Sequence, residues 1–282
     1  MLADVAGASL SPDSIVDRNR VTVLGDPDGP VLMFAHGFGC AQGMWARIVP
    51  FFTDTYRVVL FDHVGAGQSD PAAYDRDKYS SLAGYAADLL ELCAALEMRD
   101  VTLVAHSVSS MMAVAAAVQQ PDRFRQLVLI APSPSYIDDP ADGYVGGFSR
   151  ADIDELLESM DNNYFAWAAA IAPMVMGNPD SPELSAELTG SFCRTNPDTA
   201  RDFARVTFLS DSRAVLSEVR VPTLVLQCSD DALAPVEVGD YIAAHIVGSE
   251  LVRLQATGHC PHVSAPLETA TAILAHLDAH VG

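Results

Sequence analysis

The sequence contains no hydrophobic run long enough to cross a membrane. Half of its 282 residues are hydrophobic, yet glycine, proline, aspartate and arginine interrupt the apolar stretches before they reach the roughly 18 residues of a spanning helix. Residues 1–12 include Asp4 and lack the basic and apolar segments of a secretory signal, so we interpret them as the loosely ordered start of an N-terminal extension covering residues 1–18. We therefore expect no association with membranes and, by default, a cytoplasmic location.

Positive charge is scarce in this chain. Lys78 is the only lysine, beside fifteen arginines. The chain has 37 acidic residues, so its formal net charge is −21. Such a surface repels a phosphate backbone, and no basic run offsets it, so we exclude nucleic acid as a partner. We interpret the acidity as a solvated surface that favours solubility, and not as a sign of a cationic ligand.

Cysteine pairs with metal-binding spacing are also absent. The five cysteines are odd in number and widely spaced, which indicates reduced thiols and not a disulfide framework. His259 and His262 lie three positions apart, but Pro261 between them argues against a helical metal site. The glycine-rich segment at residues 37–39 lacks the third glycine of a dinucleotide fingerprint. We expect neither a metal nor a cofactor.

What the sequence does contain is a series of continuous apolar runs of strand length. They lie at residues 31–35, 58–61, 101–105, 127–131 and 224–227. Runs without alternation suit strands that are buried on both faces of a parallel sheet. Helical segments separate them, most clearly at residues 82–96, where apolar residues recur every three or four positions. The pattern predicts an α/β fold with a mostly parallel sheet flanked by helices.

The alternation of strands and helices is interrupted between residues 135 and 216. This segment has no strong strand signal and contains acidic, helical and aromatic-rich stretches, so we interpret it as an all-helical insertion, or lid. The rhythm then resumes with a helix near 236–244, a strand near 251–254 and a last helix at about 267–280. The predicted core therefore comprises residues 19–134 and 217–282.

Ser107 lies where the apolar run at 101–105 meets a helical segment. This is the setting of a nucleophile elbow, in which a tight strand-to-helix turn raises a serine hydroxyl above the sheet. The elbow needs small residues two positions before and after the serine. Ala105 and Ser109 are small, but neither is the glycine of the strict G-x-S-x-G pattern. The alternative is an ordinary serine that caps the helix.

A serine hydroxyl needs a base and the base needs an acidic partner, and both types of residue follow later strands. His259 comes after the strand near 251–254, and Asp231 follows the run at 224–227. Ser, Asp, His is also the chain order required by the fold in which such an elbow occurs. Asp230 could replace Asp231, and His262 could replace His259.

The remaining histidines and the oxyanion hole complete the predicted site. We assign His36, His63 and His106 to packing. The oxyanion of an acyl-transfer reaction needs two N–H donors, and we expect these from Val108 and from Phe38 in the glycine-flanked loop after the first apolar run. The alternative for that loop is a simple tight turn.

On these residues the chain resembles the RsbQ-like α/β-hydrolases, which include the bacterial stress-response regulator RsbQ and the plant karrikin and strigolactone receptors. The resemblance covers nearly all of residues 19–280. Its marks are His36-Gly-Phe-Gly39, Arg57-Val-Val-Leu-Phe-Asp62, His106-Ser-Val-Ser109, Pro132-Ser-Pro-Ser-Tyr136, Gly146-Gly-Phe148, Asn163-Tyr164 with Trp167, Phe208 with Ser210-Asp211, Gln227-Cys228 and Gly258-His-Cys-Pro-His262. The plant receptors look similar at the position of Ser109. Ala105 stands where the family usually has glycine before the His-Ser pair.

The resemblance implies an α/β-hydrolase fold with a V-shaped lid of four helices over an apolar pocket. It implies that the pocket is lined by Phe38, Val108, Tyr136, Phe148, Trp167, Ile171, Phe192 and Phe208. Without the family, each of these aromatic residues is interpreted as lid core. A pocket of this kind favours a small hydrophobic ester or lactone.

Two functions follow as hypotheses. The first is an esterase or lactonase that works through an acyl-enzyme with Ser107, His259 and Asp231. The second is a ligand-sensing regulator, as in the resembled family, in which slow hydrolysis or binding controls a signalling protein partner. A C–C bond hydrolase or perhydrolase would use the same triad. We expect a monomer or weak dimer.

Overall fold

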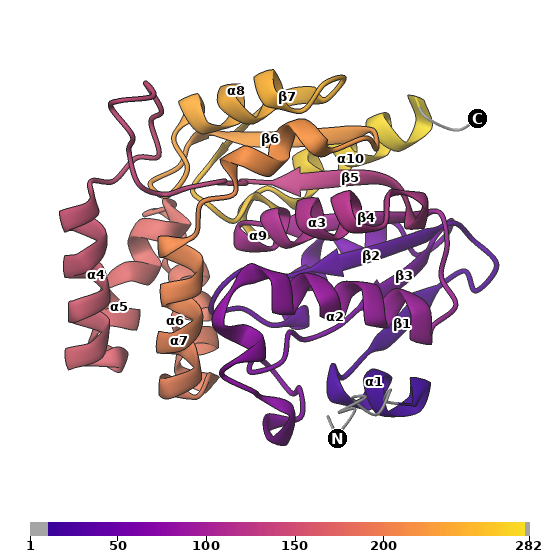
Figure 1. Ribbon diagram of the computed structural model, residues 1–282, viewed down its shortest axis with the longest axis horizontal. Helices are drawn as coiled ribbons and strands as arrows, with labels where there is room; N and C mark the ends of the chain where they lie inside the picture. The colour runs from indigo at the N-terminus through magenta and orange to yellow at the C-terminus, as the bar shows by residue number, and fades with distance from the viewer. Residues whose placement is uncertain (1–10, 280–282) are drawn as a thin grey trace, which may run out of the picture.

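The computed structural model describes residues 11–279, and its centre is a seven-stranded sheet between helices (Figure 1). The strand order is β1-β3-β2-β4-β5-β6-β7, and all neighbours are parallel except β1, which is antiparallel to β3. The strands are β1 Thr22–Gly25, β2 Val31–Ala35, β3 Arg57–Leu60, β4 Val101–His106, β5 Phe124–Ile130, β6 Thr223–Asp230 and β7 Glu250–Thr257. The predicted mostly parallel sheet is confirmed. The antiparallel edge strand β1 was not predicted from the sequence.

Helices cover both faces of the sheet, which explains its continuous apolar strands. All six residues of β4 are buried. The helices of the core are α1 Pro12–Arg18, α2 Leu82–Ala95, α3 Val108–Gln119, α8 Val236–His245, α9 Pro261–Ser264 and α10 Pro266–Ala279. Short 3-10 helices lie at η1 Gln42–Arg47, η2 Val49–Phe51, η3 Pro71–Ala73, η4 Lys78–Ser80, η5 Pro121–Arg123 and η6 Arg213–Glu218. One apolar cluster contains α2, α3 and α8, and another joins η1 to α10.

The strand order places a topological switch between β2 and β4. The chain passes from β2 to β3 on one side and returns to β4 on the other side of β2. In open α/β sheets, ligands bind at such a point, beyond the carboxyl ends of the strands. The loops after β2 and β4 carry the predicted oxyanion donors and Ser107.

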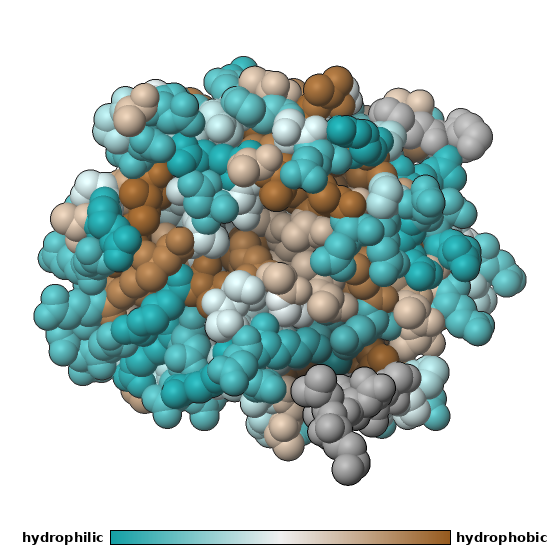
Figure 2. All heavy atoms as spheres, viewed as in Figure 1, coloured by the Kyte–Doolittle hydropathy of each residue, from teal (hydrophilic) through white to brown (hydrophobic). Residues whose placement is uncertain are grey.

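The predicted helical insertion is present as four helices that stand together beyond the end of β5 (Figure 1). They are α4 Arg150–Asn162, α5 Tyr164–Met176, α6 Pro182–Arg194 and α7 Pro197–Leu209, and we call them the lid. Their buried side chains form an apolar cluster of their own with residues of the core loops. Hydrophilic residues cover most of the molecular face in Figure 2, with hydrophobic ones in patches.

Residues 12–18 of the predicted N-terminal extension form the helix α1. Residues 1–10 lie outside the described part, as does His280 of the last predicted helix, but α1 packs against α2. Arg18 is only 6% exposed, and its guanidinium lies 3.3 Å from Asp88 and 2.6 Å from Glu91. Lys78 also reaches Asp88, at 2.6 Å. Ile15 is the apolar residue of α1 that joins the cluster with α2 and α3, and the other contacts are ionic, so hydrophobic periodicity did not reveal the attachment.

Within residues 11–279, no helix combines the length and the apolar character needed to cross a bilayer.

Candidate active site

Ser107 occupies a strained turn between β4 and α3. Its backbone has φ +57° and ψ −128°, a conformation that non-glycine residues rarely adopt. The Ser107 N–H donates to the carbonyl of Ile130, and its hydroxyl makes no capping bond to α3. The side chain is therefore free to point away from the helix, which favours the nucleophile elbow over the ordinary helix cap.

The residues two positions from Ser107 are buried and closely packed, as an elbow requires. Ala105 pairs with Ala35 of β2 on one side and Leu129 of β5 on the other. Ser109 donates its hydroxyl hydrogen to the carbonyl of His36 at 2.5 Å. Where the strict pattern has glycine, serine thus adds a hydrogen bond to the loop after β2.

The structure brings Ser107, His259 and Asp231 into one hydrogen-bonded chain. His259 Nε2 lies 2.7 Å from Ser107 Oγ, and His259 Nδ1 lies 2.8 Å from Asp231 Oδ2. The other oxygen of Asp231 accepts the N–H groups of Leu233 and Ala234 at 2.9 and 3.2 Å. These backbone donors fix the carboxylate, which in turn orients the imidazole. All three side chains are buried.

The alternatives considered for His259 and Asp231 lie elsewhere. The Asp230 side chain is exposed, and its carbonyl accepts the N–H of Gly258. His262 packs its ring against Trp45 at a centroid distance of 4.5 Å, and burial lowers its pKa to about 3. The geometry therefore favours His259 and Asp231 over both.

A short turn holds His259 between the core and the lid. Gly258 has φ +79°, and a Cβ atom there would lie 1.9 Å from the carbonyl oxygen of Met176 at the end of α5. The His259 N–H donates to the carbonyl of Val175 at 2.8 Å. Carbonyls in the last turn of a helix lack partners within the helix, so the turn and α5 satisfy each other.

The three histidines assigned to packing, His36, His63 and His106, are buried next to Ser107 and its neighbours. His106 Nε2 donates to the His259 carbonyl at 2.8 Å. The His63 N–H donates to His36 Nε2 at 3.1 Å. Burial lowers the pKa of His36 and lowers those of His63 and His106 well below the usual value. Their neutral rings support the loops around the site.

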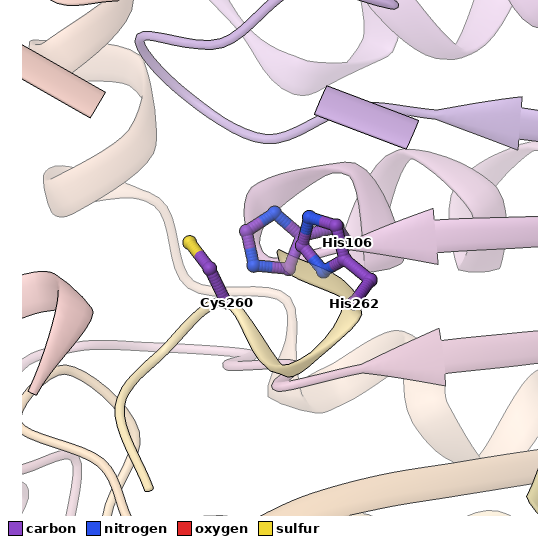
Figure 3. Close-up of side chains that lie close together, drawn as sticks. All are labelled: His106, Cys260 and His262. Atoms are coloured by element: carbon purple, nitrogen blue, oxygen red, sulfur yellow. The ribbon is translucent and has the colours of Figure 1, made fainter. Parts of the chain in front are cut away.

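One group of side chains in the described residues has metal-ligand types. Ligand atoms of His106, Cys260 and His262 lie within 4.8 Å of one another (Figure 3). However, His106 Nε2 is bonded to the His259 carbonyl, and a Cβ on Gly37 would lie 2.6 Å from His106 Nδ1. Both nitrogens of His106 are thus engaged or covered, so the group is poorly suited to a metal.

The loop after β2 runs directly against Ser107. A Cβ atom on Gly37 would lie only 3.1 Å from Ser107 Cβ, so this close approach requires glycine. Phe38 follows, and its ring meets Trp167 and Phe192 of the lid at 6.2 and 5.7 Å. On the other side, Val108 begins α3, where backbone N–H groups have no partner within the helix.

An apolar cavity of about 30 Å³ adjoins Ser107 and His259. Among the predicted lining residues, Phe38, Tyr136, Trp167, Ile171, Phe192 and Phe208 line it. Tyr136 places its hydroxyl 3.3 Å from Ser107 Oγ, and burial raises its pKa, so the phenol is neutral. Sequence reasoning missed the further lining residues Cys40, Val175, Leu188, Thr207, Leu233 and Cys260, which carry no aromatic signal.

Two predicted lining residues are not part of this cavity. Phe148 is half-buried, bridges to Ile137 and packs against the lid cluster. The side chain of Val108 packs into the sheet-side cluster with α2 and α3.

Comparisons with known proteins show what the whole chain is similar to. Karrikin insensitive 2 receptor IA from Petunia hybrida is 38% identical over 91% of this chain and 93% of that protein. Strigolactone esterase D14 from Arabidopsis thaliana is 37% identical over 93% of this chain and 97% of that protein. The solved structure of a hydrolase from Oleispira antarctica superposes with a TM-score of 0.92 at 41% identity, covering 95% and 98% of the two chains. A family model for the alpha/beta hydrolase fold matches residues 30–266, so the chain belongs to the alpha/beta hydrolase family.

Proposed function

We propose that this protein is a serine hydrolase that cleaves a small hydrophobic ester or lactone through an acyl-enzyme. The observation that carries the proposal is the continuous hydrogen-bonded chain from Ser107 through His259 to Asp231, with distances of 2.7 and 2.8 Å. The chain ends at a cavity with aromatic and aliphatic walls, which suits a hydrophobic substrate.

The reaction begins when His259 Nε2 takes the proton of Ser107 as the hydroxyl oxygen attacks the substrate carbonyl. The N–H groups of Phe38 and Val108 stabilise the negative charge that develops on the carbonyl oxygen. His259 then gives the proton to the leaving alcohol, and an acyl-enzyme remains on Ser107. Water, deprotonated by His259, attacks the acyl carbon and releases the acid. Asp231 keeps the imidazole oriented throughout.

Hydrolysis of p-nitrophenyl esters and butenolide lactones tests this proposal. We expect the wild-type protein to turn over at least one of these substrates, and Ser107→Ala to lose about 10⁴-fold or more in kcat. A fluorophosphonate should add its mass to the wild type and leave Ser107→Ala unmodified. Equal turnover by the two proteins on every substrate would remove the proposal.

A second candidate function is ligand sensing, in which the site controls a signalling protein partner. Relatives at 35 to 38% identity carry the name receptor. The His259 N–H also donates to the Val175 carbonyl, so a ligand bound at the site touches a segment tied to α5. A pull-down from native lysate with Ser107→Ala, with and without a butenolide, tests this role. A partner retained only with the butenolide supports sensing, and an unchanged set of partners argues against it.

A further inference from the structure

The cavity beside Ser107 is the smaller of two neighbouring spaces. Its volume is about 30 Å³. A second chamber of about 180 Å³ shares the walls Cys40, Leu188 and Cys260 with it. The second chamber therefore adjoins the cavity at Ser107 across these three side chains.

The second chamber is mainly apolar and lies between α6, the residues around η1 and α9. Met44, Met176, Leu184 and Val263 line it. Two charged side chains are also in its wall: Glu187, which forms an ion pair with Arg47 at 2.7 Å, and Arg194 at the end of α6. The chamber thus suits an uncharged hydrocarbon segment.

Beyond the chamber lies a polar groove of about 380 Å³. Chamber and groove share Cys40, Ala41, Gly43, Ser191 and Arg194, so the two spaces adjoin along these residues. The rest of the groove is lined by Arg20, Thr22, Gln42, Asp62, Gly67, Gln68 and Thr195.

Arg20 and Arg194 give this groove two cationic groups without partners. Both side chains are exposed, and neither guanidinium has a hydrogen bond or ion pair within residues 11–279. Asp62 is the acidic residue of the lining, and its two oxygens accept the N–H groups of Gln42 and Gln68 at 2.7 and 2.8 Å. In a chain of net charge −21, two free arginines at one groove are a local site for an anion.

We propose that the substrate is an ester with a carboxylate at its far end, which binds Arg20 and Arg194 while an apolar middle segment fills the second chamber. This inference rests on the proposed function, because it takes the reacting carbonyl to lie at Ser107. The planar guanidinium offers paired N–H donors that match a carboxylate. The cavity at Ser107 then holds the ester, the second chamber holds the apolar segment, and the groove holds the carboxylate.

The test compares esters that differ only at the far end. One series consists of p-nitrophenyl esters of dicarboxylic acids of increasing length, each matched by the ω-carboxamide. A second series places the carboxylate or carboxamide on the alcohol side, as acetate esters followed by acid release. We expect the ratio of kcat/KM for carboxylate over carboxamide to exceed about ten in one series at its best length. The ratio should fall towards one as ionic strength rises to about 0.5 M, because the arginines are exposed.

Arginine variants locate the effect. Combining Arg20→Gln with Arg194→Gln should lower the selectivity ratio about tenfold, and each change alone about threefold. Arg99→Gln is the matched control: Arg99 is exposed, has no partner within residues 11–279, and precedes β4 at the opposite end of the sheet from Ser107. It should keep the wild-type ratio.

Three results would overturn the inference. The ratio could stay near one in both series, or the groove variants could match Arg99→Gln. Alternatively, Arg194→Gln could lower the melting temperature with no change in the ratio, which would make Arg194 a charge that stabilises the end of α6. If wild type cleaves neutral esters through Ser107 and the ratio is one, only this inference fails. If Ser107→Ala is as active as wild type, the proposed function fails first.

Discussion

The sheet core and the lid contribute to the site in different ways. Every member of the Ser107–His259–Asp231 chain comes from a core loop, and backbone hydrogen bonds and tight turns fix each one. The lid contributes apolar side chains on α5, α6 and α7, packed as one cluster. Under the proposed function, the core therefore supplies the reacting groups, and the lid supplies part of the cavity wall.

The largest expected effect comes from the core. Replacing His259 by Gln removes the base next to Ser107, and kcat should fall about 10⁴-fold or more. The matched control is His262→Gln, since His262 is equally buried but packs on Trp45. It should retain activity within about tenfold. Steady-state hydrolysis of one p-nitrophenyl ester measures both, and similar losses in the two variants would contradict the assignment.

Much of this core could be predicted from the sequence because its signals are local. Short segments of the sequence indicate the buried apolar strands and the turns at Ser107 and Gly258. The edge strand β1 was missed because it is short and largely exposed, and α1 because ion pairs anchor it.

The lid was harder to predict in detail. Its helical content was visible, but which side chains face the cavity depends on how the four helices pack together. Leu188 carries no local signal for a cavity wall, and Phe148, expected there from family resemblance, lies outside it. Only the packed structure decides these positions.

The second prediction concerns acid, and it separates the two regions because no histidine falls within residues 135–216. Burial lowers the pKa values of His36, His63, His106 and His262 in the folded core. Below about pH 6.5 these histidines bind protons in the unfolded chain but stay neutral in the folded core. The free energy of unfolding therefore decreases as the pH falls towards the pKa values of the folded state. Each histidine contributes up to about 1.4 kcal/mol per pH unit.

Urea denaturation at pH 7.5, 6.5 and 5.5 measures this loss. Trp45 lies in the core and Trp167 in the lid, so single-tryptophan variants report the two regions separately. The free energy of unfolding followed by Trp45 should fall by several kcal/mol between about pH 6.5 and 5.5. His262→Gln should flatten that slope. A lid that loses its signal at higher pH than the core would reverse the comparison.

The third prediction targets the place where the two regions touch. Gly258→Ala should cost about 3 kcal/mol, because φ is +79° and the new Cβ would meet the Met176 carbonyl of α5. Gly248→Ala is the control, since it has the same φ and nothing within 4 Å. It should cost only the backbone strain, about 1 kcal/mol. Equal losses in urea denaturation would mean that the contact between turn and lid adds nothing.

The smallest effect is expected where the lid joins the core. Arg213 in η6, after the lid, pairs with Asp139 before it at 3.0 Å, with Asp211 at 2.7 Å, and lies over the Tyr144 ring. Arg213 is 16% exposed, so its removal in Arg213→Ala should cost about 1 kcal/mol.

That cost should appear as local opening of the lid, because Arg213 ties together the two chain connections through which the lid is attached. Amide hydrogen exchange should quicken in residues 135–209 and stay constant in β4 and β5. Arg253→Ala breaks an ion pair with Asp240 that is more than half exposed and lies wholly in the core, so it should leave both patterns unchanged. Faster exchange in the sheet after Arg213→Ala would show that lid and core open as one unit. Substitutions in the lid that alter specificity would then also disturb Ser107, His259 and Asp231.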